Sequence, residues 1–90
     1  MAWKVEFGRK AERQLAQVSS SIRHRILKKM HEVSALDDPR TLANPLAGEW
    51  AGYWRYRVGD YRIICKIEDA IVTVTVIEVG HRSRIYGKGA

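Results

Sequence analysis

The chain has 90 residues, and 46% of them are hydrophobic, so it is long enough for a single domain, residues 1–90, and too apolar for a disordered chain. Sixteen Lys and Arg residues stand against ten Asp and Glu residues, and the net charge of +6 is typical of a protein that binds a polyanion. The same charge can also serve solubility alone, so its distribution along the chain has to decide. The longest nearly apolar stretch, residues 70–79, is too short for a membrane-spanning helix. Glu6 and Arg9 interrupt the region where a signal peptide needs an apolar run, so we expect a cytoplasmic protein without membrane contact.

The first third of the chain predicts one strand followed by two helices. Residues 3–7 alternate apolar and polar side chains, which is the period of a strand, and Gly8 ends the run. Residues 9–18 repeat apolar side chains at spacings of three and four, as in a short amphipathic helix. A longer stripe of the same kind follows the serines at 19–21, at Ile22, Ile26, Met30 and Val33. Two helices joined by so short a link predict an antiparallel hairpin.

The remainder predicts a loop and three strands. Residues 37–52 contain two prolines and two glycines and predict the loop. The alternating or β-branched segments 53–58, 61–67 and 71–79 predict the strands, and short turn sequences separate them. The order β-α-α-β-β-β predicts an α+β fold in which the helical hairpin packs on an antiparallel sheet. Cys65 is surrounded by isoleucines and is expected to be a buried thiol.

Arginines gather on one predicted face of the sheet. Alternation places Arg55 and Arg57 opposite the apolar side of their strand, and it does the same for Arg62 and Lys66 in the next strand. If the apolar side faces the helices, these cations line the uncovered face of the sheet. A guanidinium donates two parallel hydrogen bonds to a phosphate and stays charged at any working pH, so this face suits phosphate binding.

Basic side chains also occur outside the predicted sheet. Residues 1–36 hold eight basic and three acidic side chains, an excess that is typical of a solvated helix exterior. Lys28 and Lys29 on the second helix are two of these cations. The polar tail after Gly80 contributes His81, Arg82, Arg84 and Tyr86 at the end of the last strand.

Three segments make the chain resemble the RelE toxins of bacterial type II toxin–antitoxin pairs, within the RelE/ParE superfamily. They are WKVEF, PLAGEWAGYWRYRVGDYRIICKI and VIEVGHRSRIY, and the resemblance covers nearly the whole chain. It implies the RelE-like microbial RNase fold and an endoribonuclease without metal or cofactor that cuts mRNA in the ribosomal A site. It also implies a RelB-like antitoxin that covers the basic surface. The chain would then reach operator DNA only through the antitoxin, as a co-repressor.

Carried over by position, the resemblance implies a set of site residues. The catalytic candidates are Arg57, Arg62, His81, Arg82 and Tyr86, and the RNA-binding candidates are Arg55 and Arg84. We add Lys66, Lys28 and Lys29 to the RNA-binding candidates on their own charge, not on the resemblance. Well-known members carry lysines where Arg55 and Arg57 stand, and an arginine effectively never loses its proton. A base role therefore does not pass to Arg57. His81 becomes the candidate for proton transfer, since an imidazole titrates near pH ~6.5, and the carboxylate of Glu49 is an alternative base.

The expected reaction is attack of an RNA 2′-OH on the adjacent 3′ phosphate, which leaves a 2′,3′-cyclic phosphate and a 5′-OH. The arginines would stabilise the developing negative charge, and His81 would move the proton. Tyr86 would orient the 2′-OH or stack on a base.

Other interpretations remain open at this level. ParE-type relatives poison DNA gyrase without nuclease activity, and a basic module can bind RNA without cutting it. Tyr86 can simply hold the tail down, and His81 can cap the last strand. Trp3, Trp50 and Trp54 are expected to pack rather than to bind bases. His24 and His31 lack further ligands at zinc-like spacing, so no metal site is expected.

Overall fold

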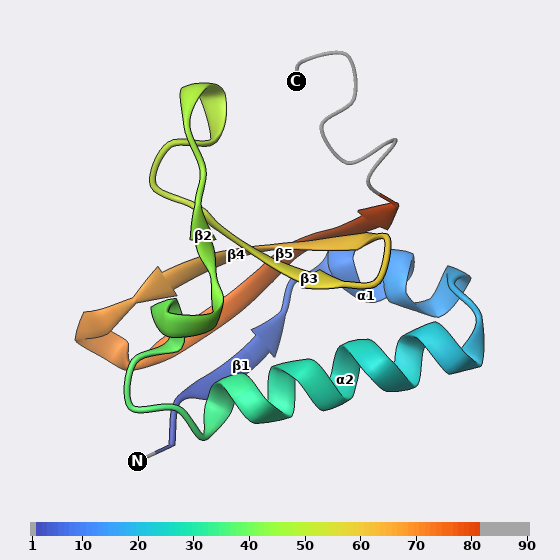
Figure 1. Cartoon of the computed structure of the whole chain (residues 1–90), viewed down its shortest axis with the longest axis horizontal. Helices are drawn as coiled ribbons and strands as arrows, with labels where there is room; N and C mark the ends of the chain where they lie inside the picture. Colours follow the sequence, from blue (N-terminus) through green and yellow to red (C-terminus); the bar gives the residue numbers. More distant parts are fainter. Residues whose placement is uncertain (1, 82–90) are drawn as a thin grey trace.

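A computed structural model describes residues 2–81 and contains two helices on one face of a five-stranded sheet (Figure 1). The helices are α1, Arg9–Gln17, and α2, Ser20–Ser34. The strands are β1 (Lys4–Phe7), β2 (Asn44–Pro45), β3 (Trp54–Val58), β4 (Tyr61–Glu68) and β5 (Thr73–His81), in the spatial order β1-β5-β4-β3-β2. The predicted α+β class is confirmed. No helix within residues 2–81 is long and apolar enough to span a bilayer.

Two details of the predicted architecture were wrong. The sheet is mixed rather than antiparallel, because β1 pairs in parallel with β5 while the other pairs are antiparallel. Residues 37–52 are more than a loop. They contain β2 and two 3-10 helices, η1 (Pro39–Leu42) and η2 (Gly48–Trp50). Both elements are too short to leave a periodic pattern, and a two-residue edge strand is defined only by its pairing with β3.

The helical hairpin is fixed by polar contacts at the junction of α1 and α2. Ser19 is the N-cap of α2, and its Oγ accepts a hydrogen bond from the Ile22 amide at 3.2 Å. The Arg23 guanidinium donates to the carbonyls of Leu15 and Val18 at 3.1 and 3.0 Å, which satisfies acceptors that the end of α1 leaves open. The hairpin therefore presents one continuous apolar side to the sheet.

The main core lies between the helices and the sheet. Its buried members come from both helices and from the three central strands: Ala11, Ile26, Met30, Val33, Tyr56, Val58, Ile63, Cys65, Val74, Val76 and Val79. Cys65 is buried as predicted, and burial raises the pKa of its thiol, so it is held as the uncharged form.

A bulge in β5 shifts the register between β4 and β5 by one residue. Ile64 pairs with Glu78 and Cys65 with Val76, so Ile77 is the extra residue. The shift lets Val76 and Val79 both reach the core. Beyond the end of β1, the Val79 amide donates instead to the Gln14 side chain at 2.7 Å, so α1 takes over the exposed edge of β5.

At the other end of the sheet, an arginine joins three segments. Arg40 in η1 donates to Asp38 and to both carboxylate oxygens of Asp69, at the start of η3 (Asp69–Ile71), and its guanidinium lies 5.6 Å from the centre of the Trp54 ring. Nearby, the Tyr56 hydroxyl donates to the Pro39 carbonyl at 2.8 Å within the core. These contacts fix the segment between α2 and β3 against the edge of the sheet.

Candidate nucleic-acid interface

The β3–β4 hairpin places two arginines directly opposite each other. Gly59 occupies the first position of the two-residue turn with φ of 57°, a conformation that glycine adopts without steric cost. This turn fixes the register in which Arg57 pairs with Arg62 and Arg55 pairs with Ile64. Opposed residues of antiparallel strands lie about 4.5–5.5 Å apart at Cα and point to the same face. The register thus confirms the prediction that Arg55, Arg57 and Arg62 share one face of the sheet.

The sequence predicts that this face of the sheet is uncovered, and that prediction is wrong. Arg62 is only 7% exposed, and Ile64 beside it is fully buried although it lies outside the main core. Arg55 is partly buried, and only Arg57 is exposed. The segment that carries β2 and η2 rises on this side of the sheet, opposite the helices (Figure 1). The result is a partly sheltered cationic surface, and we call Arg55, Arg57 and Arg62 the arginine face.

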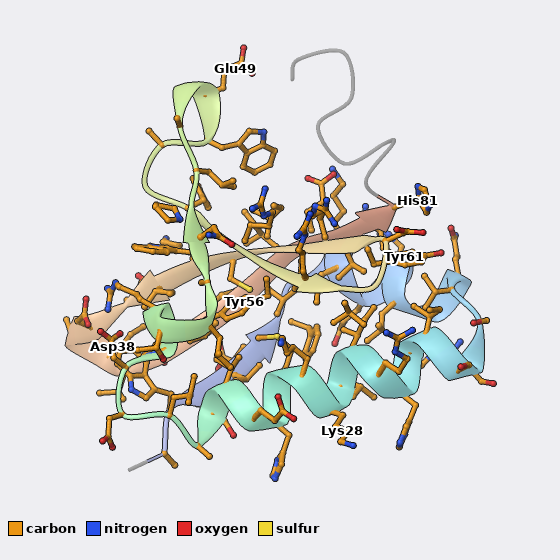
Figure 2. All side chains as sticks on the ribbon, in the orientation of Figure 1. Lys28, Asp38, Glu49, Tyr56, Tyr61 and His81 are labelled. Carbon is orange, nitrogen blue, oxygen red and sulfur yellow. The ribbon has the colours of Figure 1, made fainter. Side chains whose placement is uncertain are left out.

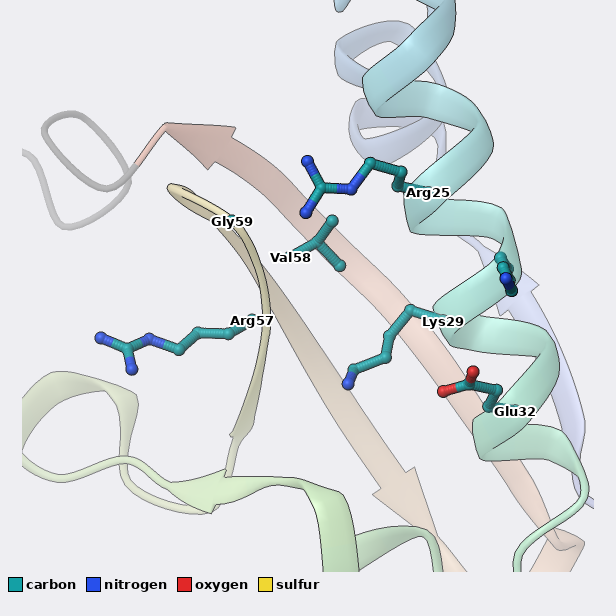
Figure 3. Close-up of a pocket in the computed structure, with 7 residues that line it drawn as sticks. Arg25, Lys29, Glu32, Arg57, Val58 and Gly59 are labelled. Atoms are coloured by element: carbon teal, nitrogen blue, oxygen red, sulfur yellow. The ribbon is translucent and has the colours of Figure 1, made fainter.

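The register brings two cations, Arg57 and Arg62, to opposed positions on neighbouring strands. Like charges directly opposite each other on neighbouring strands destabilise a sheet. Burial increases the effect, because charges interact more strongly where water is excluded. A phosphate that contacts both Arg57 and Arg62 converts this repulsion into attraction, and guanidinium geometry suits that contact. The side chain of Arg57 projects away from α2, consistent with a binding surface on the far side of the hairpin (Figure 3).

His81 lies next to the arginine face but begins on the opposite side of the sheet. In the register of β4 and β5, Arg62 pairs with Gly80 and Tyr61 pairs with His81. Because side chains alternate, His81 shares the face of Tyr61 and not that of Arg62. Its imidazole meets the Tyr61 ring edge-on, with centroids 5.6 Å apart and an interplanar angle of 84°. His81 is the last residue of β5, at the end of the sheet where Tyr61 also lies (Figure 2).

The remaining assigned residues are dispersed or undescribed. Lys66 lies on the Arg62 side of β4 but is roughly 13 Å further along the strand, at ~3.3 Å per residue, and it pairs with Glu68 at 3.7 Å. Lys28 lies on α2, away from the arginine face, and Glu49 lies at the tip of the η2 segment, distant from His81 (Figure 2). The assignments to Arg82, Arg84 and Tyr86 lie outside the described residues.

The structure differs from the sequence-based assignments at two residues, Lys29 and Tyr61. Lys29 extends from α2 toward β3 on the helical side of the sheet, so it does not join the arginine face (Figure 3). Tyr61 was not predicted as a site residue, although its ring meets that of the candidate His81 edge-on. The available signal was its position directly after the Gly59–Asp60 turn, where it must pair with a residue of another strand.

The other titratable groups of the described residues include residue types that bind metals and groups with shifted pKa values. Residues 2–81 contain no group of three or more His, Cys, Asp or Glu side chains placed to hold a metal ion. Burial raises the pKa of the Tyr56 phenol well above its usual range, so its proton remains on the oxygen that donates to Pro39.

Comparison with known proteins gives a consistent assignment. Residues 5–86 match the family described as the ParE toxin of the type II toxin–antitoxin system parDE. The chain is 35% identical over 85 residues to the mRNA interferase toxin RelE of Escherichia coli strain K12, covering 93% of this chain and 87% of RelE. It is 34% identical over 89 residues to toxin RelG of Mycobacterium tuberculosis, covering 96% and 98%.

Solved structures show the same fold. A variant of the E. coli toxin RelE in the free state superposes with a TM-score of 0.78 and 29% identity, covering 94% of this chain and 88% of that one. The intact E. coli RelBE toxin–antitoxin complex contains a chain with a TM-score of 0.74 and 30% identity, with coverages of 89% and 96%. The RelBE2 complex of M. tuberculosis contains one with a TM-score of 0.70 and 32% identity, with coverages of 91% and 100%. With the family match and the curated relatives, these likenesses establish that the chain belongs to the RelE/ParE superfamily of type II toxin–antitoxin toxins.

Proposed function

We propose that this chain is a RelE-type toxin, an endoribonuclease that cuts mRNA in the ribosomal A site and thereby inhibits translation. The observation that carries the proposal is the direct opposition of Arg57 and Arg62 on one sheltered face of the β3–β4 hairpin. Support also comes from E. coli RelE, which is 35% identical and is named an mRNA interferase.

In the proposed reaction, the 2′ oxygen of the RNA forms a bond to the adjacent phosphorus while the bond from phosphorus to the 5′ oxygen breaks. A base takes the 2′-OH proton, and a proton is delivered to the departing 5′ oxygen. The products are a 2′,3′-cyclic phosphate and a 5′-OH. Arg57 and Arg62 would bind the non-bridging oxygens, whose negative charge grows in the transition state, and Arg55 would bind the neighbouring backbone.

His81 is the proposed proton-transfer group. It follows Gly80, which lies opposite Arg62, but its side chain starts on the Tyr61 side. The proposal therefore requires the imidazole to act around the end of β5, with the edge-on Tyr61 ring limiting its orientations. Arg82 and Tyr86 stay in the proposed catalytic set, and Arg84 in the proposed RNA-binding set, on resemblance alone.

The proposed partner is a RelB-like antitoxin that neutralises the toxin by covering the arginine face. Chains of similar fold occur in the RelBE complexes named above, at 30% and 32% identity. We further propose that the toxin contacts operator DNA only through this antitoxin, as a co-repressor in the cytoplasm.

Mapping RNA ends tests the proposed activity. Expression in cells is expected to produce cuts within translated mRNA, with 5′-OH and 2′,3′-cyclic phosphate ends. The same transcript without a start codon should remain intact, because it does not enter the A site. Intact translated mRNA in cells that the toxin has arrested would sink the nuclease proposal. The controls are His81→Ala and Arg62→Ala, compared at the same protein level as the toxin.

The family match to ParE toxins favours one alternative, a gyrase inhibitor of the same fold without nuclease activity. In that case, expression would damage DNA and leave transcripts whole. Gyrase supercoiling measured with purified toxin separates the two functions, since a nuclease should leave the reaction unaffected.

A further inference from the structure

A second cationic surface lies on the helical side of the β3–β4 hairpin. A groove of about 330 Å³ opens between α2 and the hairpin turn, lined on the helix by Arg25, Lys28, Lys29 and Glu32 and on the hairpin by Arg57, Val58 and Gly59 (Figure 3). Arg25 and Lys29 extend from α2 toward β3, whereas the Arg57 side chain projects away from the helix. Arg25 and Lys29 are therefore the principal cations of the groove itself.

The Arg25 guanidinium is held against the turn. A methyl group at Gly59 would lie 3.4 Å from Arg25 Nη2 and 3.5 Å from Nη1, which is ordinary van der Waals contact. The guanidinium of Arg25 therefore lies beside the backbone of the turn. Glycine at residue 59 is required by the positive φ of the turn, not by the approach of Arg25.

The charges of this groove are not neutralised by close ion pairs. Among residues 2–81, none of the ion pairs within 4.0 Å includes Arg25, Lys29 or Glu32. Glu32 is the only acidic side chain among the lining residues, against four cationic ones. Val58 is the only large apolar side chain there, and it is 7% exposed. The groove thus offers charge and hydrogen-bond donors with little apolar surface.

We propose that the groove between α2 and the β3–β4 turn binds the phosphodiester backbone of RNA at a point separate from the scissile phosphate. This inference rests on the proposed function. Arg25 and Lys29 bind the phosphate oxygens. The RNA is thereby held on both sides of one hairpin, by the groove on the helical side and by the arginine face on the other.

The chemistry of the lining favours RNA over an acidic protein segment. Protein partners derive most of their binding energy from apolar and aromatic anchors seated in pockets. Within residues 2–81, a more apolar depression of about 360 Å³ lies elsewhere, lined by Phe7, Leu15 and Ala16 together with Glu12 and Arg23. A backbone phosphate needs only oriented cations, which is what the groove between α2 and the turn provides.

Binding of an uncleavable RNA tests the inference separately from the nuclease. The probe is a fluorescent 20-nucleotide 2′-O-methyl RNA, which lacks the attacking hydroxyl, and the readout is anisotropy at several salt concentrations. For Arg25→Gln/Lys29→Gln, we expect Kd to rise about tenfold at 0.1 M salt and the salt slope to fall by about 1.4, at ~0.7 per phosphate contact with a single strand. Glu32→Gln should instead tighten binding.

Matched controls remove the same charge from exposed positions on α1. Arg9→Gln/Arg13→Gln should change Kd and the salt slope much less, and Glu12→Gln should not tighten binding. If the groove variant and the α1 control weaken binding equally, the groove is not a site and the inference fails. It also fails if a polyglutamate peptide displaces the probe as well as unlabelled RNA does, because the groove would then take any polyanion.

The nuclease proposal is read out independently in the same proteins. At saturating programmed ribosomes, cleavage by Arg25→Gln/Lys29→Gln should keep the wild-type maximal rate, with only the concentration for half-maximal rate increased. If the groove variant loses RNA binding but the wild-type protein does not cleave mRNA, the groove is supported and the proposed nuclease fails. If the wild-type protein cleaves mRNA but the groove variant binds RNA as tightly as the wild type does, the nuclease is supported and the groove fails.

Discussion

Arg40 lies between two carboxylates and beside an indole ring, whereas Arg62 lies, 7% exposed, opposite another arginine. The positive charge of Arg40 is balanced within the fold, and its contacts connect η1, η3 and β3. Arg62 instead lies opposite a second cation, Arg57, across the β3–β4 hairpin. From this position and the proposed function we expect Arg62 to act on the RNA and Arg40 to stabilise the fold, so the two residues give opposite predictions.

The largest expected effect is on cleavage. Arg62→Ala should slow single-turnover cleavage of mRNA on the ribosome by about 10²–10³, the usual cost of losing one transition-state donor. Arg62→Met, which keeps the aliphatic bulk of the buried side chain, should behave alike and exclude a packing defect. Arg40→Ala should lower the Tm and leave the cleavage rate near that of the wild type. Equal loss of cleavage in the Arg40 and Arg62 variants would erase the distinction.

A smaller effect is expected on the structural side of the comparison. Tyr56→Phe removes the hydroxyl that donates to the buried Pro39 carbonyl at 2.8 Å. We expect it to lower the free energy of unfolding by about 1–2 kcal/mol, since the carbonyl loses its donor. Urea denaturation measures the change. Tyr53→Phe is the control, because the edge-on contact of Tyr53 with Trp50 involves only the rings, and a loss as large as that of Tyr56→Phe would contradict the assignment.

These regions also differ in how far the sequence predicts them. Alternation located Arg55, Arg57 and Arg62 on one face, because side-chain period and a two-residue turn fix the register locally. His81 was predicted to lie beside these arginines, but the sequence does not show on which face of the sheet its side chain lies. That face depends on the bulge at Ile77, a one-residue shift that lets Val76 and Val79 both pack in the core.

The contacts of Arg40 could not be predicted from the sequence for another reason. Asp38 is two residues from Arg40, but Asp69 is 29 residues away and meets it only because η1 and η3 lie at the same end of the sheet. The strand pair β2–β3 was missed as well, since two residues carry no period. Local rules thus predict the faces of strands, whereas contacts between chain segments require the tertiary fold.

Backbone strain near Asp69 provides a third, stabilising prediction. Val72 adopts φ of 48° and ψ of 49°, a left-handed conformation that is unfavourable for a β-branched residue. Val72 is 41% exposed, so a substitution removes little packing. Val72→Asn should raise the free energy of unfolding by about 0.5–1 kcal/mol, because Asn tolerates this conformation. Val74→Asn, which replaces a fully buried valine in an ordinary strand, should destabilise instead.

The smallest expected effect is a pH dependence at the Arg40 end. Hydrogen bonds from Arg40 hold the pKa of the Asp69 carboxyl below its usual range. The unfolded state therefore binds the proton more readily, so the contribution of this pair is present above the unfolded pKa of about 3.9. It is lost as the pH falls through the lowered folded-state value. Stability measured between pH 2 and 6 should vary less with pH in Asp69→Asn than in the wild type, and identical profiles would contradict the pairing.

A double-mutant cycle between Arg57 and Arg62 tests the central claim most directly. If both guanidiniums bind one phosphate, Arg57→Ala/Arg62→Ala should slow single-turnover cleavage by much less than the product of the two single effects. The cycle between Arg62 and Arg40 should show no coupling. Independent, multiplicative losses from Arg57 and Arg62, or cleavage that survives in the double variant at the wild-type rate, would contradict a shared phosphate.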